Sequence, residues 1–255
     1  MSLPKPYYDE GGITIYLGDA RLLLPHLDKV DMIFTDPPYG HNNNNNGDLI
    51  HRREAALGRP PCDSDSSLAR PIANDGVEAN DLVRWFFRQA ADMLRHGGCC
   101  CCCCCCGGGP DPQFARWSLW LDECLDFKQM VVWDKGPMGM GWHYRRSYET
   151  VLVAQKPGAA CKWYDETDRI ENIIRHIPKI IPQKTDHPTP KPAELAAHFI
   201  QLHSQRGEVV LDPFMGGGST AEAAKRLGRQ FIGIELDERW AEIAAKRLSQ
   251  EVLPL

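Results

Sequence analysis

Residues 209–220 read VVLDPFMGGGST, an apolar run that leads into a glycine-rich turn. The pattern predicts a buried strand, a tight turn with the G-x-G-x-x-G/A spacing of nucleotide-binding loops, and the start of a helix. A second apolar run, QFIGIE at residues 230–235, predicts another strand that ends in the carboxylate of Glu235. Glu235 lies about as far from the glycines as the ribose-binding acid does in a dinucleotide fold. The combination favours an α/β sheet that binds a nucleotide-like cofactor over a strand–helix turn without a ligand.

A second informative stretch, TDPPYG at residues 35–40, follows an apolar run that predicts a buried strand over Val30–Thr35. Prolines fix φ and supply no backbone N–H, so this turn is stiff and its carbonyls remain able to accept hydrogen bonds. Acceptors beside an aromatic ring suit a planar ligand that carries an exocyclic amine. The plainer alternative is a proline-rich turn with a surface aspartate and a packing tyrosine.

These stretches resemble motifs IV and I of the amino-directed DNA methyltransferases, which methylate adenine N6 or cytosine N4. HPTPKP at residues 187–192 resembles motif X of the same family and precedes an amphipathic segment, Ala193–His203. Motif IV before X and I is the order of the permuted class called beta. Strands expected at Met130–Lys135 and Tyr148–Ala154 also match family patterns, so the resemblance runs from about residue 13 to about residue 248.

The resemblance implies a Rossmann-like S-adenosylmethionine-dependent fold, with a mostly parallel central sheet, helices on both faces and a circularly permuted motif order. We expect residues 1–255 to form one domain, in which about residues 182–255 carry the cofactor site and the N-terminal half carries the catalytic turn. Both turns should lie at the carboxyl ends of neighbouring strands, where open α/β sheets bind their ligands.

The resemblance also assigns residues to the site. The catalytic residues would be Asp36, Pro37, Pro38 and Tyr39. The residues that bind S-adenosylmethionine would be Asp19, Asp36, His187, Thr189, Lys191, Asp212, Pro213, Phe214, Gly216, Gly218, Ser219, Thr220 and Glu235. Asp19 could equally be the N-cap of a helix over residues 20–27.

The chemistry expected of the catalytic turn is orientation of an amine. A base inside a duplex is out of reach and must be flipped out of the stack. Tyr39 would then stack on it, while the Asp36 carboxylate and the Pro37 carbonyl accept hydrogen bonds from the amine. Adenine enzymes of this family usually carry Asp in the motif and permuted cytosine-N4 enzymes usually carry Ser, so Asp36 favours adenine.

Double-stranded DNA is the expected partner, although a formal net charge of −5 gives no general support for a nucleic-acid binder. Two stretches are candidates for DNA recognition, an insertion or lid over residues 42–74 and a segment over residues 158–181 with interleaved aromatic and basic residues. Basic residues that could meet phosphates, or could simply be solvated surface charges, are Arg52, Arg53, Arg145, Arg146, Arg175 and Lys179. A homodimer is left open.

Eight consecutive cysteines occupy Cys99–Cys106. Consecutive strand residues point to opposite faces, whereas metal ligands must converge on one ion, so we expect no metal site here. The run instead predicts a buried central strand. Such a strand needs a reducing compartment, so the cytoplasm of a bacterial or phage-infected cell is expected. The sequence shows neither a signal peptide nor an apolar run long enough to cross a membrane.

Other functions remain open at the level of sequence. The glycine turn alone would also suit a nicotinamide-dependent oxidoreductase, but that interpretation leaves the DPPY turn unexplained. A non-catalytic DNA-binding relative, a cytosine-N4 methyltransferase, and an enzyme acting on RNA or on a protein glutamine are further alternatives. Neither the target DNA sequence nor the existence of a restriction partner follows from the sequence.

Overall fold

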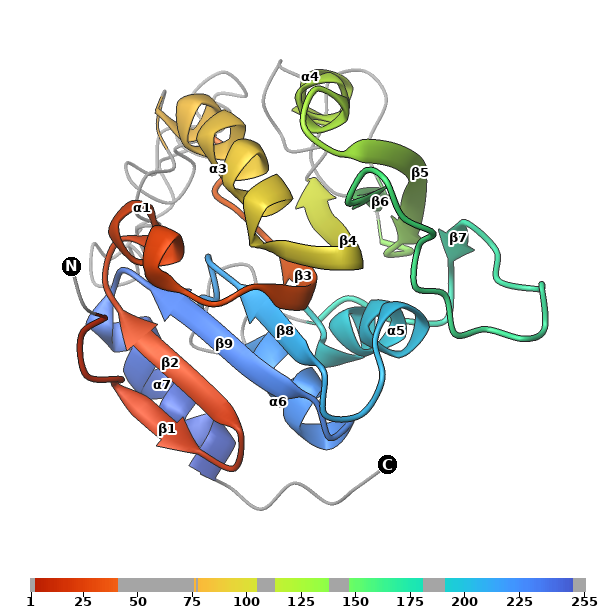
Figure 1. Ribbon diagram of the computed structural model, residues 1–255. Coiled ribbons are helices and arrows are strands. Elements are labelled where there is room, and N and C mark those ends of the chain that lie inside the picture. Colours follow the sequence, from red (N-terminus) through yellow and green to blue (C-terminus); the bar gives the residue numbers. More distant parts are fainter. Residues whose placement is uncertain are drawn as a thin grey trace, which may run out of the picture.

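The computed structural model describes residues 3–40, 76, 78–104, 113–137, 147–180 and 191–249. These residues form one nine-stranded sheet with the strand order β1-β2-β9-β8-β3-β4-β6-β5-β7 (Figure 1). The strands are β1 Tyr8–Glu10, β2 Ile13–Leu17, β3 Val30–Thr35, β4 Leu94–Cys104, β5 Asp126–Asp134, β6 Tyr148–Gln155, β7 Ile173–Ile174, β8 Val209–Asp212 and β9 Gln230–Glu235.

The middle of the sheet is parallel and its edges are mixed. Strands β2, β9, β8, β3 and β4 pair parallel with their neighbours in that order, whereas β6 runs antiparallel to both β4 and β5. The central strand β3 is buried along its whole length, as expected for a parallel strand that is covered on both faces. The predicted mostly parallel sheet is confirmed.

Helices cover both faces of the sheet, as the resemblance implied (Figure 1). One core cluster joins the sheet to α5 Ala193–His203, α6 Ser219–Arg226 and α7 Glu238–Ser249. The other joins it to α1 Ala20–Leu23, α3 Ala79–Met93 and α4 Gln113–Asp122. Each of these helices therefore buries an apolar face against one side of the same sheet.

Most of the predicted elements appear with the expected limits. The strand predicted over Val30–Thr35 is β3, and the amphipathic segment predicted over Ala193–His203 is α5. The helix expected over residues 20–27 is instead the short α1, followed by a 3₁₀ turn over Leu24–His26 that contains Pro25. Pro25 supplies no N–H for a continuing α-helix, which accounts for the early end.

The cysteine run forms the central strand that was predicted, as far as the structure describes it. Strand β4 pairs with β3 on one side and β6 on the other through Cys99–Cys102. Cys99, Cys101 and Cys103 face α5, whereas Cys100 and Cys102 face α3 and α4. Cys105 and Cys106 lie outside the described residues, as does the insertion predicted over residues 42–74.

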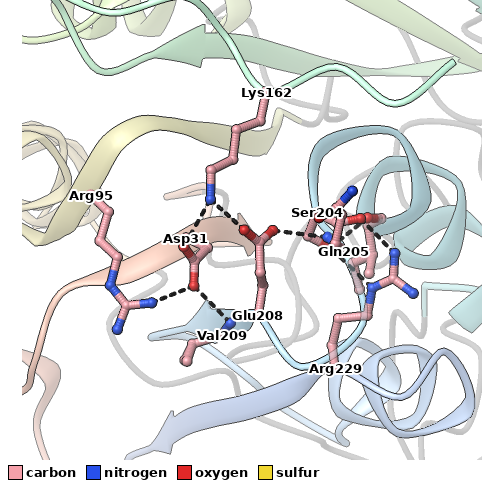
Figure 2. A network of polar contacts seen from close by, with 9 residues as sticks. Asp31, Arg95, Lys162, Ser204, Gln205, Glu208, Val209 and Arg229 are labelled. Carbon is pink, nitrogen blue, oxygen red and sulfur yellow. Dashed lines mark hydrogen bonds and ion pairs between the residues drawn. The ribbon is translucent and has the colours of Figure 1, made fainter.

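A polar network fastens the amino ends of β3 and β8 together (Figure 2). The buried Asp31 carboxylate accepts hydrogen bonds from Arg95 Nη1 at 2.5 Å, Lys162 Nζ at 2.9 Å and the Val209 backbone N–H at 3.0 Å. Burial alone would raise the pKa of Asp31, but these donors hold it below its ordinary value. Lys162 also donates to Glu208 at 2.5 Å. The network anchors the amino end of the sheet, opposite the two predicted turns.

In the part of the chain that the structure describes, no helix combines the length and the apolar character that a membrane crossing requires.

Candidate active site

The DPPY turn and the glycine turn lie side by side at the carboxyl end of the sheet. Strands β3 and β8 are parallel neighbours, with Met32 opposite Val210 and Ile33 opposite Leu211. Their last residues are joined directly, because the Thr35 hydroxyl donates a 2.7 Å hydrogen bond to Asp212 Oδ1. The predicted juxtaposition of two turns that are distant in the chain is confirmed.

Asp212 is the polar centre of this junction. Its side chain is buried and also accepts hydrogen bonds from the Thr220 hydroxyl at 2.7 Å and from the Phe214 backbone N–H at 3.1 Å. Burial raises its pKa to about 7, although the three donors oppose that rise. Since Asp212 and Thr220 bond to one another inside the protein, we propose that they shape the glycine turn and do not contact the cofactor.

The glycine turn is fastened to the end of β9 through Glu235. Gly216 donates its backbone N–H to Glu235 Oε2 at 2.8 Å, and Asp237 donates its N–H to Oε1 at 2.9 Å. Burial raises the pKa of Glu235, while these backbone donors lower it. Gly216 and Gly218 both have positive φ, at 53° and 77°, so the turn depends on glycine at these two positions.

Gly218 also allows α6 to pack closely on α7. A Cβ atom at Gly218 would lie 2.8 Å from the Cβ of Ala244. Ser219 begins α6 directly after this glycine, so the first backbone N–H groups of the helix lie at the turn.

The end of β2 joins the same edge of the sheet. Gly18 donates its backbone N–H to the Glu235 carbonyl at 2.8 Å, which brings the next residue, Asp19, to the end of β9. Asp19 is the N-cap of α1, accepts a hydrogen bond from the Arg21 N–H at 2.8 Å and forms an ion pair with the Arg21 side chain at 2.6 Å. The capping role is therefore present, and cofactor binding by Asp19 remains a prediction.

In the DPPY turn, both carboxylate oxygens of Asp36 are engaged by side chains. The Tyr39 hydroxyl donates to Oδ1, and the Lys191 ammonium donates to Oδ2 at 2.6 Å. Lys191 also lies 3.0 Å from the Tyr39 hydroxyl and 5.2 Å from the centre of its ring. Burial raises the pKa of Asp36, and the Lys191 charge opposes this rise. Lys191 was expected to bind the cofactor, and the structure joins it to the Asp36 carboxylate, so cofactor binding by Lys191 stays a prediction.

Two charged residues of this site were not selected from the sequence. Glu149, near the start of β6, lies 3.3 Å from Lys191 and 2.7 Å from Lys135. Burial would raise the pKa of Glu149, but the two lysines lower it to about 2. Both residues fall in the strands that were expected at Met130–Lys135 and Tyr148–Ala154, but no spacing rule connects either one to Asp36.

Two residues of α4 hold the DPPY turn in place and were also missed. Gln113 donates its side-chain N–H to the Tyr39 carbonyl at 2.7 Å. The Trp117 ring packs against the Tyr39 ring with 6.0 Å between centres. Gly40 follows with φ of 73°, and a Cβ there would lie 3.0 Å from the Gly76 carbonyl. The turn is thus held through the Tyr39 carbonyl, through the Tyr39 ring and at Gly40, where the chain leaves it.

The other predicted cofactor residues are only partly placed. Pro213 and Phe214 lie in the glycine turn, and the Phe214 ring packs edge-on against Phe86 with 5.4 Å between centres. His187 and Thr189 fall outside the described residues.

The predicted DNA-recognition segment is split between the two ends of the sheet. Lys162 contacts the network at the amino ends of β3 and β8, and the Tyr164 N–H donates to the Leu202 carbonyl at the end of α5. Farther along, the Ile177 carbonyl accepts a 2.7 Å hydrogen bond from the Trp133 indole near the carboxyl end of β5. Exposed Arg175 and Lys179 belong to this second part, although Arg175 already pairs with Glu171 at 2.7 Å. The other basic candidates, Arg52, Arg53, Arg145 and Arg146, fall outside the described residues.

A family model described as DNA methylase, covering the N6 and N4 enzymes, matches residues 30–246. The chain belongs to this family. The match includes both turns and Lys191, so the site described above lies within the matched region apart from Gly18 and Asp19.

Named relatives agree with this assignment. The chain is 26% identical over 269 residues to the type II methyltransferase M2.DpnII of Streptococcus pneumoniae, covering 98% of this chain and 94% of the relative. The crystal structure of M1.HpyAVI with S-adenosylmethionine superposes with a TM-score of 0.66 at 27% identity, covering 93% of this chain and 100% of that one. The cytosine-N4-specific PvuII methyltransferase, at 18% identity and a TM-score of 0.68, shares the fold over 98% of this chain and 90% of its own.

The cofactor of this enzyme is S-adenosylmethionine, with which M1.HpyAVI and a second relative, TTHA0409 of Thermus thermophilus, were crystallised. TTHA0409 is 25% identical with a TM-score of 0.62, and 92% of each chain is covered. The glycine turn fits such a group, because it combines two positive-φ glycines, a helix start and an acceptor carboxylate on Glu235.

Replacing Asp212 with Asn should change how stability depends on pH. The folded-state pKa of Asp212 is raised from 3.8 to about 7, so the folded protein holds a proton that the unfolded chain releases between these values. The stability that Asp212 contributes is therefore present at low pH and lost as the pH rises to about 7. Denaturant unfolding across this range should show wild type losing stability relative to Asp212→Asn. A constant difference between the two proteins would contradict the assignment.

Proposed function

We propose that this enzyme methylates the exocyclic N6 amine of adenine at a specific sequence in double-stranded DNA. The observation that carries the proposal is the position of Asp36 at the end of β3, next to the glycine turn at the end of β8. A carboxylate there can accept a hydrogen bond from an amine while a cofactor occupies the neighbouring turn. The family description as DNA methylase makes DNA the substrate class that we favour.

The choice of adenine over cytosine rests on the residue type at position 36. Adenine enzymes of the family usually carry Asp at this position, whereas permuted cytosine-N4 enzymes usually carry Ser. The likeness to PvuII does not weigh against this choice, since at 18% identity it concerns the fold alone.

We propose that the turn rearranges when the flipped base enters. Both Asp36 oxygens are engaged, one by the Tyr39 hydroxyl and one by Lys191. Each carboxylate oxygen can accept two hydrogen bonds, so the amine enters either as a further donor or in place of one of these two. We propose that Tyr39 yields, because its ring must turn to stack on the base, while Lys191 stays with the carboxylate. Exchange of one donor for another keeps this partly buried acceptor satisfied throughout.

The glycine turn and Glu235 would hold S-adenosylmethionine, which supplies an electrophilic methyl group when bound. The Glu235 carboxylate is positioned by Gly216 and Asp237 to accept from ribose hydroxyls. The N-terminus of α6 would face the carboxylate of the methionine part. Asp36 and the Pro37 carbonyl orient the amine nitrogen, so the contribution of the protein is mainly alignment of the reacting atoms.

We propose that Lys191 keeps Asp36 ionised. Burial favours the protonated acid, which would donate a hydrogen bond instead of accepting one from the amine. The lysine charge opposes this, and Glu149 and Lys135 fix the lysine in position. Lys191 is thus a positioning residue for the acceptor, not a contact of the cofactor.

Within residues 158–181, we propose that the part from Asn172 onward contacts DNA. Residues from Asn172 onward run beside the carboxyl end of β5, on the same side of the sheet as the DPPY turn. We therefore favour Arg175 and Lys179 over Trp163 and Tyr164 as candidates for meeting phosphates near the target base.

Replacing Asp36 with Ala should lower the rate of methyl transfer at least about a hundredfold, because alignment of the amine is lost. Binding of S-adenosylmethionine, measured by calorimetry, should remain close to wild type. Asp36→Asn is the matched control, since it retains one acceptor oxygen. Its rate of methyl transfer should fall between those of wild type and Asp36→Ala. Near-normal methylation by Asp36→Ala would refute the role of this carboxylate.

Replacing Lys191 with Met should move the acidic limb of the pH–rate profile to higher pH. Burial would then raise the pKa of Asp36 without its nearest opposing charge, so ionisation would need a higher pH. Lys135→Met is the control, because Lys135 pairs with Glu149 and not directly with Asp36 in the described structure. An unchanged acidic limb in Lys191→Met would contradict the proposed role of Lys191.

Nucleosides from the DNA of cells that express this protein should contain N6-methyladenine. Digestion followed by mass spectrometry measures both candidate products in one experiment, and cells expressing Asp36→Ala provide the background. N4-methylcytosine without N6-methyladenine would overturn the choice of base while leaving the family assignment intact.

A further inference from the structure

Three residues that are soft metal ligands lie close together on the face of the sheet that α5 covers. They are Cys99 and Cys101 of β4 and His203, the last residue of α5, and their ligand atoms all lie within 4.8 Å of one another. All three side chains are buried. The cluster lies away from the methyl-transfer site, since neither strand position 99 nor the end of α5 contacts the DPPY or glycine turns among the described interactions.

A fourth donor lies beside them. Cys161, in the chain that follows β6, has its sulfur 3.9 Å from His203 Nδ1 and so lies beside the imidazole ring. Cys161 is only partly buried, which gives this otherwise enclosed cluster a side open to solvent. Three sulfurs and one imidazole make up the Cys₃His set of structural zinc sites.

The spacing of the two strand sulfurs matches tetrahedral coordination. Sulfurs held about 2.3 Å from one zinc ion at tetrahedral angles lie about 3.8 Å apart. The sulfurs of Cys99 and Cys101 are 3.7 Å apart, and they form no disulfide. Zinc would therefore fit between these two residues without a change of strand register.

The imidazole already has the outer contact that metal-binding histidines use. A ligating histidine commonly donates its second ring N–H to a backbone carbonyl, which fixes the orientation of the ring. His203 Nδ1 lies 3.1 Å from the Lys162 carbonyl, so Nδ1 would carry the proton and Nε2 would be the nitrogen that binds the ion. The Trp163 ring packs edge-on against the imidazole with 5.3 Å between centres. Lys162 is itself held by Asp31 and Glu208, so this outer contact belongs to an anchored segment (Figure 2).

We propose that Cys99, Cys101, Cys161 and His203 form a structural zinc site. The ion would tie the central strand β4, the chain that follows β6, and the end of α5 to one another. Soft thiolates and an imidazole select zinc over magnesium or calcium, which prefer oxygen ligands. From the sequence we expected no metal here, because consecutive strand residues alternate in direction. The alternation instead leaves every second cysteine on one face, where residues distant in the sequence complete the set.

The test is the metal content of the full-length protein, purified without chelators from cells supplied with zinc. Elemental analysis should find about one zinc ion per chain. Replacing that zinc with cobalt(II) should give a sulfur-to-cobalt charge-transfer band and the intense visible bands of a tetrahedral site. Removing the metal with a chelator should lower the melting temperature of wild type.

Matched variants locate the site. Cys101→Ser should lose the zinc and the cobalt spectrum, and its melting temperature should no longer respond to chelator. Cys100→Ser makes the same change one residue away on the opposite face of β4 and should retain all three properties. Zinc far below one equivalent in wild type, zinc retained by Cys101→Ser, or equal loss in both variants would overturn the proposal. Each result is independent of methyl transfer, so it leaves the proposed function untouched.

Discussion

The active site depends on the parallel pairing of β3 with β8, closed at its carboxyl end by the hydrogen bond from Thr35 to Asp212. One turn follows each strand, and the pairing of the strands sets the distance between the two turns. Parallel neighbours cannot be joined by a short hairpin, so the two turns can be far apart in the chain and still adjacent in space. The order of motifs along the chain therefore matters less than the order of strands in the sheet.

The bond between Thr35 and Asp212 is buried, and its environment explains why the junction is stiff. Asp212 accepts from three donors that belong to the end of β3, the glycine turn and the start of α6. A buried polar group that loses a partner costs about 1–3 kcal/mol, so the three elements hold one another in place. Asp36 follows Thr35 directly in the chain, so its position is fixed by the same junction. It differs from Asp212 in having Lys191 beside it.

Charge separates the roles of the two aspartates. Asp212 lies among hydroxyl and amide donors, and burial raises its pKa to about 7. Asp36 lies next to a lysine that is itself held between two carboxylates. The first environment suits a structural carboxyl group, and the second suits an acceptor that must remain ionised in a partly desolvated pocket.

Much of this arrangement could be predicted from the sequence. Apolar runs that end in glycine or proline turns marked β3 and β8, and the motif resemblance placed both turns at one edge of the sheet. The pairing of Lys191 with Asp36 could not be predicted, because it depends on how α5, which begins two residues after Lys191, packs against β3. The role of Glu149 could not be predicted for a similar reason, since its position beside Lys191 follows from the antiparallel register of β6. The cysteine cluster was excluded because local alternation is visible in a sequence, whereas the approach of Cys161 and His203 is not.

The most direct measurement of the central claim is a crystal structure of the full chain with S-adenosylmethionine bound. The account predicts that the ribose lies on Glu235, that the methionine part lies in the glycine turn, and that the methyl group points towards Asp36. A cofactor bound elsewhere on the sheet, or one whose methyl group faces away from the DPPY turn, would contradict it.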